Sequence, residues 1–463
     1  MRAPLETDYL VVGTGAAGMA FTDALLGHSD ATFTLVDRRH APGGHWIDTY
    51  PFVRLHQPSD FYGVSSVPLG RGTVDATGLH AGFHEMASAD ELRAYYAQVM
   101  EQHFLPTGRV HHLPCSSHAL GPDGRHLVTS RLTGAVREVR VRRKLVDASY
   151  LEGRIPATSP PPFDVAEGVR CVAAGDLARV DDPPERYVVI GAGKTALDTC
   201  VWLLTQGVPA SAIQWVRPRE AWWVNRRFNQ PDEGLPDFFA GVGLQFKAMA
   251  QATSVDDLFA RLEADGLFLR VDTKVTPTMS RGAMLSESEL VLLRRIGDVV
   301  RAGHVRRIER DRIVFDGSSV PTSPGTLHVH CAAVGLARPP LRPIFEADRV
   351  TLQPLFWGFA CFPAALLGVA EATIADTAEK NRVCPPIRYW DEPRDYLSSY
   401  LALMVHNRAR AAHPAIEAWA KGTRLNPMSG LKAHRDHALV TQTWADIKRY
   451  GAAAGANLVK LLQ

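Results

Sequence analysis

The chain has 463 residues, of which 46% are hydrophobic and 22% are charged, and its formal net charge is +2. This length can bury two or three domain cores, and such a weak net charge gives no strong field for nucleic acid. The longest apolar stretch, residues 356 to 370, is interrupted by Gly358, Pro363 and Gly368 and is too short to span a membrane. Residues 1 to 8 carry no apolar leader, so we expect a cytoplasmic protein.

The segment "YLVVGTGAAGMAFTDALL", residues 9 to 26, predicts a buried strand, a glycine-rich turn and a helix. Gly13 allows the tight turn, Gly15 lets a pyrophosphate approach the backbone, and Gly18 lets the helix pack against the sheet. The phosphates would meet unpaired N–H groups at the helix start, formed by Ala16 and Ala17. This turn predicts a dinucleotide site.

A second strand, "ATFTLVD", ends at Asp37, which lies 19 residues after Gly18 and is followed by Arg38. A carboxylate at this place can accept hydrogen bonds from a ribose diol. We therefore expect FAD at the first site, because its adenosine ribose carries a free 2′-hydroxyl, and we include Arg38 among the residues that bind it.

The same arrangement returns in "YVVIGAGKTALDTCVWLL", residues 187 to 204, where Gly191, Gly193 and Ala196 occupy the three small positions. We expect Lys194 and Thr195 to open the helix and bind the second cofactor. A Walker-type phosphate loop would need glycine at position 188, where Val188 stands, so that reading of "GKT" is excluded.

The strand after this second turn runs into Arg217 and Arg219 rather than into a carboxylate. A guanidinium can pair with a 2′-phosphate in a charge-assisted contact, which favours NADPH at the second site. The alternative is a solvated pair of arginines on a surface loop.

The six cysteines, at positions 115, 171, 200, 331, 361 and 384, form no C-x-x-C pattern. A thioredoxin-like pair, a redox disulfide beside a flavin and a cysteine zinc site are therefore disfavoured, and we expect no metal. Cys200 and Cys331 lie in apolar segments and are predicted to be core residues.

The two turns predict an α/β fold with two Rossmann-like domains, in which an NADPH domain is inserted into an FAD domain and helices follow at the C-terminus. Short strands between residues 109 and 149 predict an antiparallel meander, and residues 88 to 104 predict a helix. The strand at 326 to 335 is expected to rejoin the first sheet. The expected boundaries are 1–160 and 326–385 for the FAD domain, 161–325 for the NADPH domain, and 386–463 for the C-terminal helices.

The order of motifs resembles the class B flavin-dependent monooxygenases, which include flavin-containing monooxygenases, N-hydroxylases and Baeyer–Villiger monooxygenases. The resemblance covers about residues 8 to 385 and is most specific in "APGGHWIDTYPFVRLHQPSDFYG", residues 41 to 63. It implies that the loop containing Gly43, Gly44, His45 and Trp46 lies along the FAD. It also implies that His56, with Gln57 beside it, stands near the isoalloxazine ring, where flavin-containing monooxygenases usually carry Asn. A core role for Trp46 and a structural role for His56 stay open.

The chain departs from the family in the fingerprint F-x-G-x-x-x-H between the two turns. The equivalent stretch is "CVAAGDLARVDDP", in which Ala173 replaces the phenylalanine and Arg179 the histidine. This departure puts Baeyer–Villiger activity in doubt. A second departure is "CAAVG", residues 331 to 335, where the family often shows Ala-Thr-Gly.

The resemblance implies that NADPH reduces the flavin, which then reacts with O₂ to give a C4a-(hydro)peroxyflavin. One oxygen atom would pass from it to a small organic substrate. Two alternatives use the same turns: a flavin-dependent NADPH dehydrogenase, reductase or oxidase without oxygen transfer, and a non-catalytic NADP-binding protein. Residues 221 to 231, "AWWVNRRFNQP", would line a cofactor or substrate cleft or form an aromatic cluster between domains.

Overall fold

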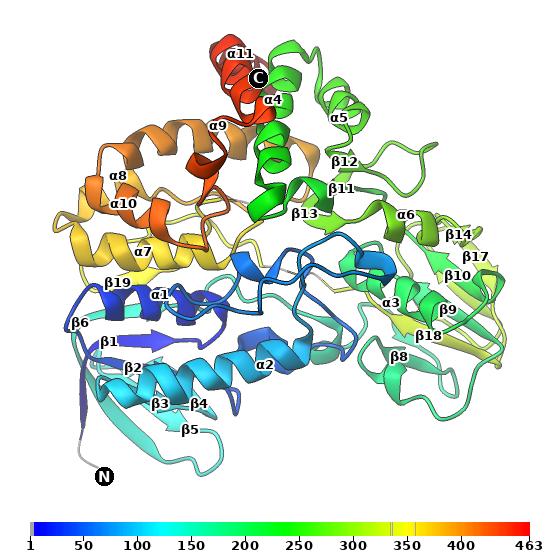
Figure 1. Cartoon of the computed structure of the whole chain (residues 1–463). Coiled ribbons are helices and arrows are strands. Elements are labelled where there is room, and N and C mark those ends of the chain that lie inside the picture. The colour runs from blue at the N-terminus through cyan, green and yellow to red at the C-terminus, as the bar shows by residue number, and fades with distance from the viewer. Residues whose placement is uncertain (1–3, 334, 336, 357) are drawn as a thin grey trace.

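A computed structural model describes residues 4–333, 335, 337–356 and 358–463 of the chain (Figure 1). The fold contains two main sheets. In each of them, one strand leads into a glycine-rich turn and a helix. Figure 1 shows the sheet of β1 at the left, the sheet of β9 at the right, and the C-terminal helices above the first sheet. The predicted α/β class with two Rossmann-like units is confirmed.

The first sheet has the strand order β3-β2-β1-β6-β5-β4, with β19 beside β6. Its strands are β1 (Leu5–Val12), β2 (Phe33–Val36), β3 (Val110–Leu113), β4 (Ser116–Leu120), β5 (His126–Ser130), β6 (Val136–Asp147) and β19 (Arg349–Thr351). β1 lies between β2 and β6 and is parallel to both. The first glycine turn therefore leaves the middle of a parallel sheet, as the apolar run before it predicts.

The antiparallel meander is confirmed in part. β4, β5 and β6 are antiparallel neighbours, but β3 pairs in parallel with β2 and extends the Rossmann sheet. Residues 136 to 147 form one long strand, β6. Its first half pairs with β5 and its second half continues along β1 to β19, so a single long strand joins the meander to the parallel sheet.

The second sheet is parallel throughout, with the order β14-β10-β9-β18-β8. Its strands are β8 (Cys171–Ala173), β9 (Arg186–Ile190), β10 (Ile213–Val216), β14 (Asp298–Val300) and β18 (Thr326–His330). The expectation that the strand at 326 to 335 rejoins the first sheet is wrong, because β18 pairs with β9 and β8. The chain returns to the first sheet later, at β19.

Two smaller sheets complete the strands. One, of order β12-β11-β13, contains β11 (Ala221–Asn225), β12 (Phe268–Leu269) and β13 (Met279–Leu285). The other, of order β17-β16-β15-β7, contains β7 (Asp164–Val165), β15 (Arg307–Ile308), β16 (Arg312–Phe315) and β17 (Ser318–Pro321). Trp222 of β11 is buried and stacks on Phe259, so residues 221 to 225 form an aromatic cluster in the core.

The helices lie between and around the sheets. They are α1 (Ala16–Gly27), α2 (Ala89–Gln98), α3 (Lys194–Thr205), α4 (Leu235–Gln251), α5 (Val255–Ala264), α6 (Glu287–Leu293), α7 (Cys361–Thr373), α8 (Thr377–Val383), α9 (Pro393–Ala411), α10 (Pro414–Gly422) and α11 (Ala438–Leu462). The predicted helix at 88 to 104 begins with a capping box between Ser88 and Glu91 and continues past α2 as a π-helical turn. Among the described residues, no helix is both long and apolar enough to cross a membrane.

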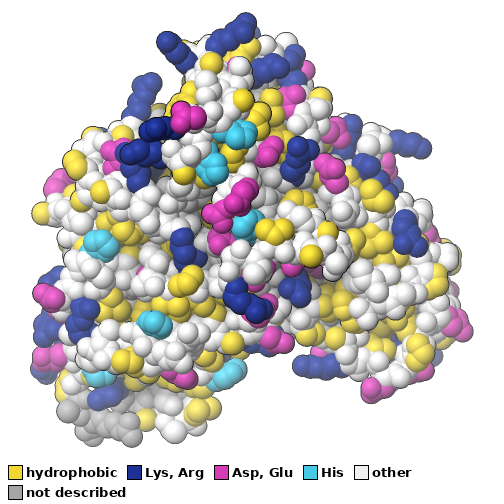
Figure 2. Space-filling view, viewed as in Figure 1, with side chains coloured by type: hydrophobic (Ala, Val, Ile, Leu, Met, Phe, Trp, Pro, Cys, Tyr) yellow, Lys and Arg dark blue, Asp and Glu magenta, His cyan; other side chains and the backbone are white. Residues whose placement is uncertain are grey.

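Two helix pairs tie distant parts of the chain together. α7 packs against α1, and α11 packs against α4 (Figure 1). Gly368 of α7 makes the first contact close, because a Cβ there would lie 2.6 Å from the backbone oxygen of Phe21. Charged side chains of both signs are spread over the face in Figure 2, in keeping with the small net charge.

Candidate functional site

The first glycine turn has the close packing that the motif predicts. Gly13 adopts a φ of 107°, and a Cβ on Gly18 would lie 2.0 Å from the oxygen of Gly13. α1 begins after Gly15 without a side-chain cap, so among the described residues no capping side chain accepts from the N–H groups of its first turn, which include those of Ala16 and Ala17. An uncapped helix start at the carboxyl edge of a parallel sheet is suited to an anion.

Asp37 lies directly after β2 and holds the glycine turn in place. Its Oδ2 accepts hydrogen bonds from the N–H of Thr14 at 2.7 Å and from the Thr14 hydroxyl at 2.9 Å, while Oδ1 accepts from the N–H of Arg39 at 2.8 Å. Arg38 is half exposed and its guanidinium pairs with Glu152 at 2.6 Å. The two residues stand beside the turn as predicted, and their cofactor contacts stay predictions.

The loop of Gly43 and Gly44 lies against the first turn. The N–H of Gly43 donates to the oxygen of Thr14 at 2.8 Å, and a Cβ on Gly44 would come within 2.8 Å of the Gly15 Cα. Only glycine permits this approach, which brings the two parts of the predicted FAD site together. The resemblance implies that both parts line one cofactor, and this role stays a prediction.

Trp46 follows this loop and is 7% exposed. Its Nε1 donates to the Tyr62 hydroxyl at 2.9 Å, within a core cluster that also contains Tyr95 and Tyr96. His45 stays exposed and its ring lies beside the indole. Trp46 therefore has the contacts of a core aromatic residue, the alternative that the sequence left open.

The second turn repeats the first. α3 begins after Gly193 without a side-chain cap, and no atom would lie within 4 Å of a Cβ on Gly193, which leaves space above the turn. Ala196 is fully buried in the third small position. The oxygen of Gly191 accepts the indole N–H of Trp215 at 2.9 Å. A cavity of about 150 Å³ lies beside Gly191 at the same edge of the sheet.

Arg217 follows β10 and is buried, with 4% of its surface exposed. Its guanidinium lies 4.5 Å from the ring centroid of Trp215 and its Nη2 is 3.3 Å from Glu220 Oε1. Burial lowers its pKa. In the part of the chain that the structure describes, Nε and Nη1 have no hydrogen-bond partner. Two buried donors without acceptors suit an anionic oxygen, such as that of a phosphate.

Arg219 has a different environment. Its guanidinium lies 3.4 Å from Asp391, a carboxylate that also pairs with Arg281 at 2.7 Å and with Arg338 at 3.3 Å. Three arginines share this one carboxylate. Arg219 therefore stands in a positively charged group of its own, and its predicted role in support of Arg217 stays a prediction.

His56 and Gln57 lie in the loop before η2 (Ser59–Phe61). We call the region around the first glycine turn the first part of the chain and the region around the second turn the second part, and this loop lies where they meet. His56 Nδ1 accepts the N–H of Met284 at 3.2 Å, so the ring proton is on Nε2. Burial, with the nearby charges of Lys194 and Arg226, lowers the pKa of His56 to about 3, and the ring is neutral at pH 7. Gln57 is 4% exposed, and its Nε2 lacks a partner among the described residues.

A buried ionic cluster adjoins His56. We name Lys194, Asp198, Arg226 and Glu289 the Glu289 cluster. Lys194 Nζ lies 2.5 Å from Asp198 and 3.5 Å from Glu289, and Arg226 Nη1 lies 2.7 Å from Glu289. The side chain predicted to bind the second cofactor, Lys194, is therefore already paired with two carboxylates.

The cluster is linked to the first part of the chain. Arg226 Nε donates to the backbone oxygen of His56 at 3.1 Å, and the Tyr50 hydroxyl donates to Asp198 at 2.7 Å. Burial raises the pKa of Glu289, but Lys194 and Arg226 hold it well below its usual value. The sequence motifs do not predict this cluster. Its one local signal is the capping box of Ser286 and Glu289 at the start of α6, which says nothing about Arg226.

Comparison with known proteins places the chain among mycobacterial relatives. No family model matches it. The uncharacterized protein Rv2000 of Mycobacterium tuberculosis is 42% identical over 462 residues, which cover 99% of this chain and 85% of that protein. The chain belongs to the family of this protein. The uncharacterized protein Mb2023 of Mycobacterium bovis matches with the same identity and coverage.

Solved structures establish the fold. The polycyclic ketone monooxygenase of Thermothelomyces thermophila is 13% identical with a TM-score of 0.54, over 98% of this chain and 89% of that chain. A cyclohexanone-bound cyclohexanone monooxygenase is 12% identical with a TM-score of 0.50, over 94% of this chain and 99% of that chain. This chain therefore has the fold of the class B flavin-dependent monooxygenases, as the "GGHW" loop and the two turns predict.

Proposed function

We propose that the protein is an FAD- and NADPH-dependent monooxygenase that transfers one oxygen atom from O₂ to a small organic substrate. The observation that carries the proposal is the pair of uncapped glycine turns, each at the carboxyl end of a strand that is parallel to both of its neighbours. A protein that binds a single dinucleotide needs one such turn. Two turns in one chain are suited to a flavin and the nicotinamide that reduces it.

The first site fits FAD in three respects. The uncapped start of α1 can bind the pyrophosphate, and the Gly43–Gly44 loop comes close enough to line a long cofactor. Gln57 Nε2 is a buried donor that finds no hydrogen-bond partner among the described residues. A bound flavin would supply the redox chemistry. The residues would bind and orient it and exclude water from its ring.

The second site fits NADPH through Arg217, whose two unpartnered nitrogens suit a 2′-phosphate. Neutral His56 lies next to Arg226 and Lys194, whose charges are balanced by Glu289 and Asp198, so the junction between the two parts holds ion pairs but no protonated imidazole. We propose that this junction is where the nicotinamide and the flavin ring meet. To accept the oxygen atom, the substrate needs a nucleophilic nitrogen or sulfur atom, or a ketone group.

The test begins with the purified protein, its absorption spectrum and the cofactor that heat releases. We expect a yellow protein whose released cofactor runs with FAD on chromatography and whose flavin is bleached faster by NADPH than by NADH without oxygen. A protein that stays colourless after reconstitution with excess FAD would contradict the proposal.

Oxygen transfer is tested separately by measuring NADPH consumption, O₂ uptake and peroxide release with panels of amines, sulfides and ketones. A monooxygenase couples NADPH and O₂ to one oxygenated product and releases little peroxide. Stoichiometric peroxide with every substrate would instead identify an oxidase. NADPH-dependent reduction of an organic acceptor without O₂ uptake would identify a reductase or dehydrogenase.

A further inference from the structure

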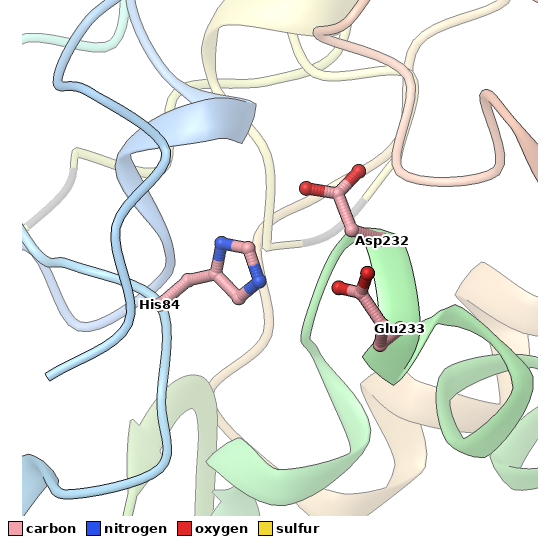
Figure 3. Close-up of side chains that lie close together, drawn as sticks. All are labelled: His84, Asp232 and Glu233. Atoms are coloured by element: carbon pink, nitrogen blue, oxygen red, sulfur yellow. The ribbon is translucent and has the colours of Figure 1, made fainter. Parts of the chain in front are cut away.

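We propose that His84, Asp232 and Glu233 bind one divalent transition-metal ion, and that this ion is Zn²⁺. Figure 3 shows the imidazole and the two carboxylates pointing toward one another across a gap between two segments of the chain. One ligand atom from each residue lies within 4.8 Å of the others. Acidic side chains and a histidine also gather near the start of α4 on the face in Figure 2.

The environment of His84 is the observation that points to a ligand. The residue is 6% exposed, and its Nδ1 has no hydrogen-bond partner in the described chain. Nδ1 lies 3.6 Å from Asp60 Oδ2, a buried oxygen that also lacks a partner. In Figure 3 the other ring nitrogen, Nε2, faces Asp232 and Glu233. A buried imidazole nitrogen without a hydrogen-bond partner costs free energy, and an ion bound at Nε2 would offset that cost by fixing the ring proton on Nδ1.

A metal at Nε2 would satisfy both unpartnered atoms together. Coordination uses the Nε2 lone pair, so the ring proton must reside on Nδ1, from which it can be donated to Asp60. The carboxylate then fixes the orientation of the ring and makes it a stronger ligand. Asp60 thus acts as a positioning residue, and His84, Asp232 and Glu233 supply the ligand atoms.

The backbone already holds the two segments together. The N–H of His84 donates to Gln230 Oε1 at 2.9 Å, and Gln230 Nε2 donates to the backbone oxygen of Arg226 at 3.1 Å. The N–H of Ser59 donates to the oxygen of Glu85 at 2.9 Å, which keeps Asp60 beside His84. Asp232 adopts the left-handed region, with a φ of 50°. The ligands are therefore presented by anchored segments.

The local charge favours a cation. No lysine or arginine in the described ranges forms an ion pair within 4 Å with Asp60, Asp232 or Glu233. Three carboxylates thus lie around one histidine, and the nearby positive charge is that of Arg424, which donates to the backbone oxygen of Asp60 at 2.6 Å. Burial raises the pKa of Asp60, whereas the charges of His84 and Arg424 lower it and that of Asp232 raises it.

The ligand types select the metal. Imidazole nitrogen is a ligand for Zn²⁺ and other transition metals, whereas Mg²⁺ and Ca²⁺ prefer oxygen alone. Zinc bonds to nitrogen and carboxylate oxygen are about 2.0–2.2 Å long, so the three ligand atoms must end up at most about 4 Å apart. Asp232 and Glu233 are exposed and can close that small gap by rotation of their side chains. Three protein ligands leave the fourth position for water.

The position of this site suggests its effect. His84 and Asp60 belong to the segment that follows the predicted flavin loop, whereas Asp232 and Glu233 precede α4 in the second part of the chain. A bound ion would link the two parts a short distance from the Glu289 cluster, since Gln230 connects Arg226 to His84. Zn²⁺ would therefore stabilise the folded protein by binding to it and not to the unfolded chain.

The test uses the full chain, stripped with EDTA and dialysed, in isothermal titration with ZnCl₂ at pH 7. We expect one Zn²⁺ per chain at micromolar or tighter affinity, a rise in the unfolding temperature with Zn²⁺, and no comparable rise with Mg²⁺. The variant Asp232→Asn/Glu233→Gln should bind Zn²⁺ at least about a hundredfold more weakly. Both substituted side chains are exposed, so this variant should fold normally.

The matched control is Asp181→Asn/Asp182→Asn. It replaces two exposed acidic residues that are neighbours in the sequence and are not among the proposed zinc ligands. It should bind Zn²⁺ like the original chain. Replacement by Co²⁺ provides a second readout, because a nitrogen and oxygen ligand set with few ligands gives a visible absorption band that the first variant should lose. Absence of stoichiometric binding, or equal binding by the Asp232/Glu233 variant, would overturn the proposal.

Discussion

Arg217 combines deep burial with two guanidinium nitrogens that find no acceptor in the described chain. Leaving such a donor unsatisfied costs about 1–3 kcal/mol, and more when the group is charged. The carboxylate of Glu220 compensates one side of the group only. The residue is therefore expected to gain most from a ligand that brings anionic oxygens to Nε and Nη1.

Replacement of Arg217 by Ala should weaken the use of NADPH by about tenfold or more, because one charge-assisted contact contributes about 1.5–3 kcal/mol. The use of NADH should stay nearly unchanged. The measurement is kcat/KM for flavin reduction with each nucleotide. Arg125→Ala is the control, since this exposed side chain lies beside the first sheet and pairs with Asp123 and Glu138. Equal losses for both nucleotides in the Arg217 variant would show a structural role.

Gln57→Leu tests the unpartnered amide near the predicted flavin ring. Removing a buried donor that has no acceptor should leave the stability of the flavin-free protein unchanged or raise it slightly. Affinity for FAD should fall severalfold, since a hydrogen bond contributes about 0.5–1.5 kcal/mol. Urea unfolding and FAD titration measure the two effects. Unchanged FAD affinity together with a large loss of stability would contradict this role.

The sequence predicts part of the site at this scale. Gly13, Gly15 and Gly18 could be assigned because a strand, a turn and a helix impose their spacing locally. The burial of Arg217 and the pairing of Lys194 could not, because both depend on side chains far along the chain. His84 and Asp232 escape prediction for the same reason: they are almost 150 residues apart and belong to no contiguous motif.

At the scale of elements, the first turn of α6 contains a residue, Glu289, that has two roles. Glu289 caps the helix by accepting the N–H of Ser286 at 2.8 Å, and it pairs with Arg226 and Lys194. Because Arg226 is 1% exposed, its charge has little water to compensate it. The start of this helix thus depends on an ionic cluster that also contacts the loop of His56.

Glu289→Gln should lower the free energy of unfolding by about 3–5 kcal/mol at pH 7, because it leaves two buried cations with one carboxylate fewer. Urea unfolding measures this loss. Glu287→Gln is the control on the same helix, since Glu287 is exposed and glutamine can still accept the hydrogen bond of Asn225. A Glu289 variant as stable as this control would show that the cluster adds nothing to stability.

The stability difference between the original chain and Glu289→Gln is also expected to depend on pH. The pKa of folded Glu289 is below its ordinary value of 4.5, so the ion pairs are fully present above that pH and are lost as the pH falls below it. The stability difference between the original chain and Glu289→Gln should therefore be constant near neutrality and shrink below about pH 4.5. A difference that grows on acidification would contradict the assignment of the low pKa.

The elements themselves were predicted unevenly. The helix at 88 to 104 carries its own capping box and could be placed from sequence. The strand at 326 to 330 could not, because an apolar parallel strand has the same pattern in either sheet. Its partner is decided by the backbone of β9, with which it pairs along its whole length.

For the whole molecule, several contacts join the two parts into one unit. The Glu289 cluster reaches His56 and Tyr50, and α11 packs against α4 from the inserted region. Interfaces of this kind are expected to make unfolding cooperative, even though each part has its own sheet and core.

We therefore expect one thermal unfolding transition that both FAD and NADP⁺ shift to higher temperature. A nucleotide at a hundred times its Kd should stabilise the folded state by about 2.7 kcal/mol. Differential scanning calorimetry, with NAD⁺ as the matched control ligand, measures the shifts. Two separate transitions, each responding to one cofactor, would show that the parts unfold independently.

The packing of α7 on α1 has a consequence for how the chain is made. α1 leaves the ribosome early, yet the helix that covers its apolar side chains, including Phe21 and Leu25, is encoded more than 300 residues later. At a synthesis rate of about 5–20 residues per second, this surface stays uncovered for roughly 20 s to a minute. The nascent first sheet is thus expected to need a chaperone until Gly368 brings α7 against it.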